Sequence, residues 1–90
     1  MTVSEYIIQQ RKDYVQLLSQ ELKEYDQEKS PTVKKMLEER IGGINVAFDY
    51  LEIRTIEECQ WFAVRLNQHF KGEKKLTYDE IVEYMRLEGV

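Results

Sequence analysis

The chain has 90 residues, a single cysteine and a formal net charge of −4, from 17 acidic and 13 basic residues. This length provides one modest hydrophobic core, so residues 1–90 are predicted to form a single domain. The mild acidity and the lack of a basic stripe argue against a module that binds duplex nucleic acid. One cysteine cannot form an internal disulfide, and neither a secretory segment nor a long apolar run is present. We therefore expect a cytoplasmic protein that does not bind membranes.

The first predicted helix runs from about residue 4 to residue 27. Thr2 with Glu5, or alternatively Ser4, supplies an N-cap. Apolar side chains recur at helical spacing, at Ile8, Val15, Leu18, Leu22 and Tyr25. This spacing predicts an amphipathic helix with one face in the core.

The segment LSQEL at 18–22 is similar to the SQELD signature of small two-helix phosphatases that act on sporulation response regulators. The resemblance covers five of the ninety residues and implies that activity. Lys23 stands where the signature has the acidic residue expected to matter for phosphatase action. The segment also falls on the first predicted helix, whereas that family carries it on the second. No residue role is therefore carried over to this chain.

A second helix is predicted over 31–70, with Ser30 as its cap and Pro31 in its first turn. One apolar stripe continues through it: Val33, Leu37, Ile41, Ile44, Phe48, Leu51, Thr55, Cys59, Phe62, Leu66 and Phe70. The mean step of about 3.7 residues is closer to a straight helix than to a left-handed coiled coil. The first two helices are therefore expected to form a long antiparallel hairpin.

The pair Gly42–Gly43 challenges this continuity, because two interior glycines cost roughly 2 kcal/mol relative to alanine. A turn at the pair is the alternative, and it would divide the helix. The apolar stripe crosses the pair from Leu37 and Ile41 to Ile44 without a change of phase. We therefore predict a continuous helix, with a kink allowed at 42–43.

A second apolar stripe lies on the opposite side of this predicted helix. The predicted interface consists of this stripe and two flanking arginines: Val46, Tyr50, Ile53, Arg54, Trp61, Val64 and Arg65. Gly43 falls on the same side, where it would let another backbone approach closely. The other helices are too short to cover both stripes, so an intermolecular contact is expected, with a homodimer as the leading arrangement. In the alternative, the third helix covers this stripe and Trp61 is a core residue.

The third helix is predicted over 77–88, after the polar linker KGEKK at 71–75, whose glycine is predicted to cap the end of the preceding helix. Thr77 and Glu80 have the spacing of a capping box, and Leu76 and Ile81 that of a hydrophobic staple. The predicted fold class is therefore all-α, a long helical hairpin with a short third helix, resembling a three-helix bundle.

The residues with reactive side chains do not form a catalytic pattern. Cys59 lies in the first stripe and is interpreted as a small buried hydrophobe. His69 is ten residues further along, about 15 Å up the same helix, so the two cannot form a nucleophile–base pair. His69 is interpreted as a residue at the core boundary, and neither a metal ligand pair nor a cofactor motif accompanies it.

These observations predict a non-catalytic protein–protein interaction module: an adaptor, an assembly factor or an inhibitor, of the kind often encoded on bacterial mobile elements. The expected partner is a second copy of the chain, another protein, or both. One alternative is a nucleic-acid-binding regulator that uses the basic segment 65–75, with Arg65, Lys71, Lys74 and Lys75 meeting phosphates. A small regulatory enzyme is the second alternative.

Overall fold

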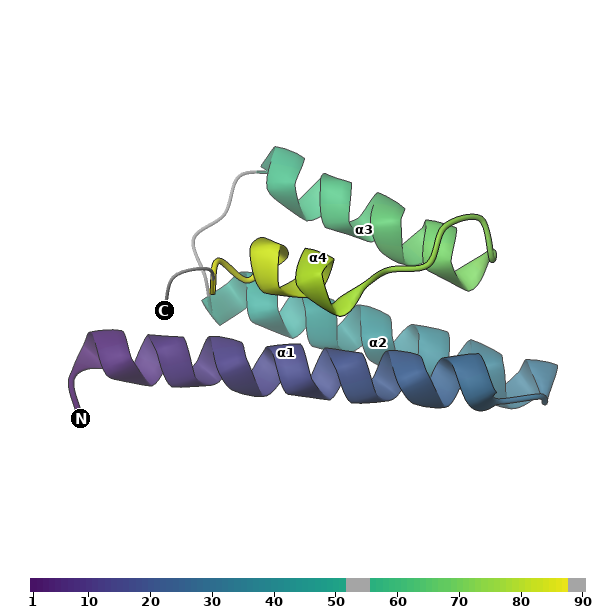
Figure 1. Ribbon diagram of the computed structural model, residues 1–90, viewed down its shortest axis with the longest axis horizontal. Helices are drawn as coiled ribbons and strands as arrows, with labels where there is room; N and C mark the ends of the chain where they lie inside the picture. Colours follow the sequence, from purple (N-terminus) through teal and green to yellow (C-terminus); the bar gives the residue numbers. More distant parts are fainter. Residues whose placement is uncertain (52–55, 88–90) are drawn as a thin grey trace.

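The computed structural model describes residues 1–51 and 56–87, with side chains for 1–47 and 57–87. Within these ranges the regular structure is helical and contains no strand, so the predicted all-α class is confirmed. The helices are α1 (Val3–Gln27), α2 (Pro31–Leu51), α3 (Ile56–Phe70) and α4 (Tyr78–Tyr84). Successive helices alternate in direction, with α3 and α4 stacked on the layer formed by α1 and α2 (Figure 1).

The two longest helices begin as their sequences predict. The Thr2 hydroxyl caps α1 by accepting a hydrogen bond of 3.1 Å from the Glu5 amide. The Ser30 hydroxyl accepts from the Val33 amide at 3.4 Å at the start of α2. α2 then passes through Gly42–Gly43 without interruption, which confirms the predicted continuity at this pair.

The predicted single helix over 31–70 is wrong. α2 ends at Leu51, and α3 begins at Ile56 and runs back in the opposite direction (Figure 1). A straight helix of forty residues would extend about 60 Å, whereas the longest dimension of the molecule is 43 Å. The reversal brings Phe62 and Leu66 into the same core as Ile41. The spacing of the stripe gave no sign of the break, because the α3 core positions happen to continue the phase of α2.

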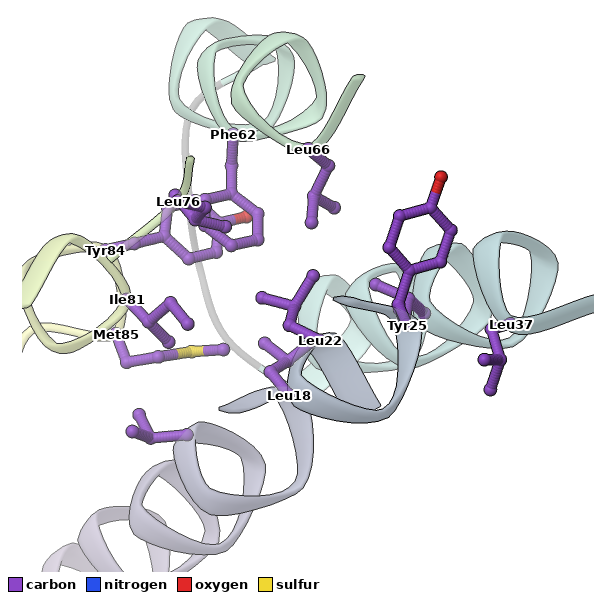
Figure 2. Close-up of a cluster of buried hydrophobic side chains, with 12 residues drawn as sticks. Leu18, Leu22, Tyr25, Leu37, Phe62, Leu66, Leu76, Ile81, Tyr84 and Met85 are labelled. Atoms are coloured by element: carbon purple, nitrogen blue, oxygen red, sulfur yellow. The ribbon is translucent and has the colours of Figure 1, made fainter. Parts of the chain in front are cut away.

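One hydrophobic core joins the four helices (Figure 2). Its buried members are Val15, Leu18, Leu22, Tyr25, Leu37, Ile41, Phe62, Leu66, Leu76, Ile81, Tyr84 and Met85. The rings of Phe62 and Tyr84 stack between α3 and α4, with centroids 3.6 Å apart. The Tyr84 hydroxyl donates to Asn45 Oδ1 at 3.2 Å and so connects α4 to α2.

α3 ends in a Schellman motif. The Glu73 amide donates to the Gln68 carbonyl at 2.9 Å, and the Gly72 amide donates to the His69 carbonyl at 3.1 Å. Gly72 has a φ of 73°, the left-handed conformation that this motif requires and that glycine adopts without strain. The glycine cap predicted in the linker is therefore confirmed.

The predicted start of the last helix is also confirmed, but its predicted end at 88 is wrong. Thr77 and Glu80 form the complete capping box, and Leu76 and Ile81 are both buried. α4 ends at Tyr84 and is followed by a turn in which Arg86 has a φ of 56°. The Leu87 amide donates to the Val82 carbonyl at 3.1 Å, so a second Schellman motif stops the helix.

Candidate functional site

The structure separates the residues of the predicted interface. Val46 on α2 and Trp61 and Val64 on α3 are exposed, by 51%, 45% and 54% respectively. Because the chain reverses between the two helices, these residues do not form the continuous stripe that a single helix would have given. Ile53 and Arg54 lie outside the described residues, as does the side chain of Tyr50.

Val46 and Trp61 instead border different grooves. Val46 lies beside Ala63 and Asn67 between α2 and α3. Trp61 lies between α3 and α4, with its ring centroid 6.0 Å from that of Tyr84. The acidic side chains of Glu57, Glu58 and Glu83 surround this second groove, together with Arg86. Trp61 is therefore neither a core residue nor a fully free one, since it rests on Tyr84 and leaves nearly half of its surface in solvent.

The assignment of Arg65 to the interface is wrong. Its side chain is buried, and its guanidinium donates from Nε to Glu80 Oε2 at 2.8 Å and from Nη2 to Glu80 Oε1 at 3.0 Å. Nη1 donates to Gln68 Oε1 at 2.6 Å. This two-pronged pair fastens α3 to the capping box of α4, and the Arg65 guanidinium holds the pKa of Glu80 below its usual range. Arg65 is therefore a structural clamp.

The basic segment of the nucleic-acid alternative also loses part of its charge to internal pairs. Arg65 is paired with Glu80, and Lys75 Nζ lies 3.6 Å from Asp26 Oδ2. Lys71 and Lys74 remain exposed. The segment therefore offers three exposed lysines, one of them close to Asp26, in place of the four cations that this reading required.

His69 is buried, which corrects its predicted place at the core boundary. Its Nδ1 accepts a hydrogen bond of 2.9 Å from the Leu76 amide, and its Nε2 lies 2.8 Å from Asp26 Oδ1. A ring nitrogen that accepts carries no proton, so this arrangement assigns a neutral imidazole that donates from Nε2 to Asp26. Both ring nitrogens are therefore engaged, and neither faces a nucleophile. Cys59 is partly buried, ten residues away on the same helix.

Tyr25 closes the same end of the core. Its hydroxyl lies 3.0 Å from both Glu38 Oε1 and the Phe70 carbonyl oxygen. Burial, followed by the hydrogen bond and negative charge of Glu38, raises the pKa of Tyr25 to about 12. The tyrosine remains a neutral hydrogen-bond donor that ties α1 to α2 and α3.

Within the LSQEL segment, Glu21 is buried, and Ser19 lies two residues earlier, about 200° around α1 from it. Arg40 of α2 pairs with Glu21, with Nη2 and Oε2 2.8 Å apart. The acidic residue of this segment therefore joins two helices of the fold.

The remaining candidate is the surface of α3 that points away from the core, which we call the outer face of α3. It consists of Glu57, Gln60, Trp61, Val64, Asn67 and Lys71, and all six side chains are exposed. Glu57, Val64 and Lys71 are seven residues apart, which places them within about 20° of one line along a helix. Lys71 still belongs to this helical surface, because its amide donates to the Asn67 carbonyl at 3.0 Å.

The interface predicted from the sequence includes Trp61 and Val64 but not Glu57 or Lys71, which are exposed on the same face of α3. In the predictions from sequence, Glu57 belongs to no site, and Lys71 is a phosphate contact of the nucleic-acid alternative. The seven-residue spacing from Glu57 to Val64 and from Val64 to Lys71 was the available signal. The partners of Arg65 and His69 gave no such signal, since they lie 15 and 43 residues away in the chain.

Comparisons with protein-family models, curated proteins and solved structures gave no match to this chain. Among the described residues, no helix combines the length and the apolar character needed to cross a membrane.

Proposed function

We propose that this chain is a small, non-catalytic protein-binding module, a helical bundle that contacts its partner through the outer face of α3. The observation that supports this is the exposure of Trp61 and Val64, which are 45% and 54% exposed on one side of one helix. They lie one turn apart, so their apolar surfaces adjoin. Tryptophan is the residue type most enriched among side chains that dominate binding energies.

The surroundings of Trp61 support an anchoring role. Its ring contacts Tyr84, which stacks on the fully buried Phe62. A tryptophan held in this way loses little conformational freedom when a partner covers it, so more of the contact energy remains as affinity. The rest of the face is polar, at Gln60 and Asn67, as in the rim of a typical interface.

The other exposed apolar residues are less suited to this role. Val3 and Tyr6 lie in the first turns of α1, where helix ends fray. Met36 is exposed one turn from the exposed Val33 on α2, and Tyr78 is exposed on α4, but neither position offers a tryptophan.

The test is a pull-down from the native host with the full chain and three variants. Val64→Glu places a charge at the centre of the face, on the side of α3 opposite Phe62. Trp61→Glu removes the anchor. Val3→Glu is the matched control, because it makes the same change at another exposed valine. Circular dichroism checks that each variant is folded.

We expect one protein, either a second copy of the chain or a different one, to be retained by the wild type and by Val3→Glu and lost from both α3 variants. Equal retention by all four proteins would exclude the outer face of α3 as the binding surface.

A further inference from the structure

The outer face of α3 carries charge of opposite sign at its two ends. Its amino-terminal end bears Glu57, and the groove beside Trp61 is bordered by Glu83 and by Glu58, which forms an ion pair with Arg86. Its carboxyl-terminal end bears Lys71, with Lys74 exposed in the following turn. Among the side chains described, those of residues 1–47 and 57–87, none forms an ion pair with Glu57 or Lys71. Both side chains are exposed, so a molecule that covers the face would contact them.

The positions of these charges make the face complementary to itself. Val64 lies at its centre, seven residues from Glu57 and seven from Lys71, or about 10.5 Å along the helix in each direction. When two copies of α3 pack antiparallel about a two-fold axis at Val64, Glu57 of one copy faces Lys71 of the other. The axis generates this contact twice, as in any isologous interface.

The apolar residues fit the same arrangement. The two Val64 side chains meet at the axis, and each Trp61 covers the polar region of the other copy around Asn67. A parallel arrangement would instead place Glu57 beside Glu57 and Lys71 beside Lys71, so like charges would repel at both ends. The distribution of charge therefore favours a second copy of the chain as the partner, with its α3 antiparallel to the first.

We propose that the partner of this face is a second copy of the chain, packed antiparallel through α3, with Glu57 of each copy paired to Lys71 of the other. This inference rests on the proposed function, since it names the partner of the same face. One helix face is smaller than the roughly 800 Å² per partner of a typical stable complex. The expected dimer is therefore a reversible one, with a Kd in the range of about 1 μM to 1 mM.

The test is sedimentation equilibrium of the purified full chain across this concentration range. Glu57→Lys alone turns both attractive pairs into Lys–Lys contacts, and Lys71→Glu alone turns both into Glu–Glu contacts. Each variant should dimerise about tenfold more weakly than the wild type, because each of the two exposed pairs contributes only a few-fold. An equimolar mixture should recover the wild-type Kd, because in the mixed dimer the introduced lysine meets the introduced glutamate at one end and the native pair forms at the other.

Matched controls separate the pairing from general effects of charge. Glu5→Lys also replaces a glutamate in the first turn of a helix, as Glu57→Lys does. Lys12→Glu changes another exposed lysine. These two controls should leave the Kd within about twofold of the wild type, and mixing them should give no gain.

If the wild type is monomeric at all of these concentrations, the proposal that the partner is a second copy is wrong. It is also wrong if the wild type dimerises but its Kd is unchanged by Val64→Glu, Glu57→Lys and Lys71→Glu. A dimer weakened by Val64→Glu but not recovered in the mixture overturns the antiparallel arrangement. The proposed function fails separately, through equal retention of all variants in the pull-down. A different protein retained through Val64, with a monomeric wild type, leaves the function in place and overturns this inference alone.

Discussion

The two faces of α3 differ in how their polar groups are satisfied. On the inner face, Phe62 and Leu66 are buried, and the buried polar residues Arg65 and His69 have partners on α4 and α1. On the outer face, an apolar centre is exposed between unlike charges that have no partner in the described part of the chain. A helix can therefore specify its own fold with one face while its other face retains the composition of a binding surface.

The largest expected effect is the difference in stability between two variants, each with a substitution on one face of α3. Phe62→Ala should lower the free energy of unfolding by about 3–5 kcal/mol, because it empties a fully buried site and removes the stack on Tyr84. Val64→Ala should change it by no more than about 0.5 kcal/mol at low protein concentration. Urea denaturation measures both. Similar shifts for the two variants would contradict the assignment of the faces.

Removal of the clamp should have the next largest effect. Arg65→Ala leaves Glu80 without its main partner and should cost about 1.5–3 kcal/mol, the range for hydrogen bonds to charged groups. Arg65→Lys should recover only part of this loss, because an ammonium cannot reproduce the two-pronged contact. Urea denaturation of Arg65→Ala, Glu80→Ala and the double variant would measure the coupling, and additive losses would exclude the clamp.

The same pair should be visible in the pH dependence of stability. Because Arg65 lowers the pKa of folded Glu80, the pair stabilises the protein above the unfolded pKa of about 4.3. This contribution is lost as the pH falls through the lower, folded pKa. In Arg65→Ala, the free energy of unfolding should therefore fall less steeply as the pH is lowered below about 4. The same pH dependence in the variant and the wild type would argue against the pair.

A smaller effect is expected where the inner face meets the start of α4. Thr77→Ala removes the acceptor of the Glu80 amide and should cost about 1 kcal/mol. Thr77→Ser keeps the hydroxyl and serves as the control. A denaturation midpoint that is the same for alanine, serine and threonine would show that the capping box contributes nothing.

The smallest expected effect is at an exposed glycine outside α3, where a substitution should stabilise the protein rather than destabilise it. A Cβ added at Gly43 meets no atom within 4 Å, so Gly43→Ala should stabilise the protein by about 0.5–1 kcal/mol through helix propensity. Gly72→Ala is the contrasting control, because its φ of 73° should make it destabilising by about 1 kcal/mol. Thermal unfolding of both variants measures the difference, and a loss of stability at Gly43 would indicate a contact that requires the glycine.

The features that the sequence determined alone depend on neighbouring residues. The capping box joins Thr77 to Glu80, and α2 continues through Gly42–Gly43 because its apolar positions keep one helical phase. The glycine cap at Gly72 follows from a conformation that few other residues adopt readily. Each of these depends on interactions within about five residues, so each could be predicted from the pattern.

Only the tertiary structure decided where the long apolar pattern divides and which polar residues are buried. The periodicity of a helix repeats at each turn, so a second helix that begins in the same phase cannot be distinguished from a continuation of the first. Arg65 lies about 100° around the helix from the exposed Val64, and it is buried because Glu80 approaches on that side. His69 is buried because Asp26, 43 residues earlier in the chain, reaches its ring. These contacts exist only once the helices have packed, and the packing that buried Arg65 also left Trp61 and Val64 on the outside of α3.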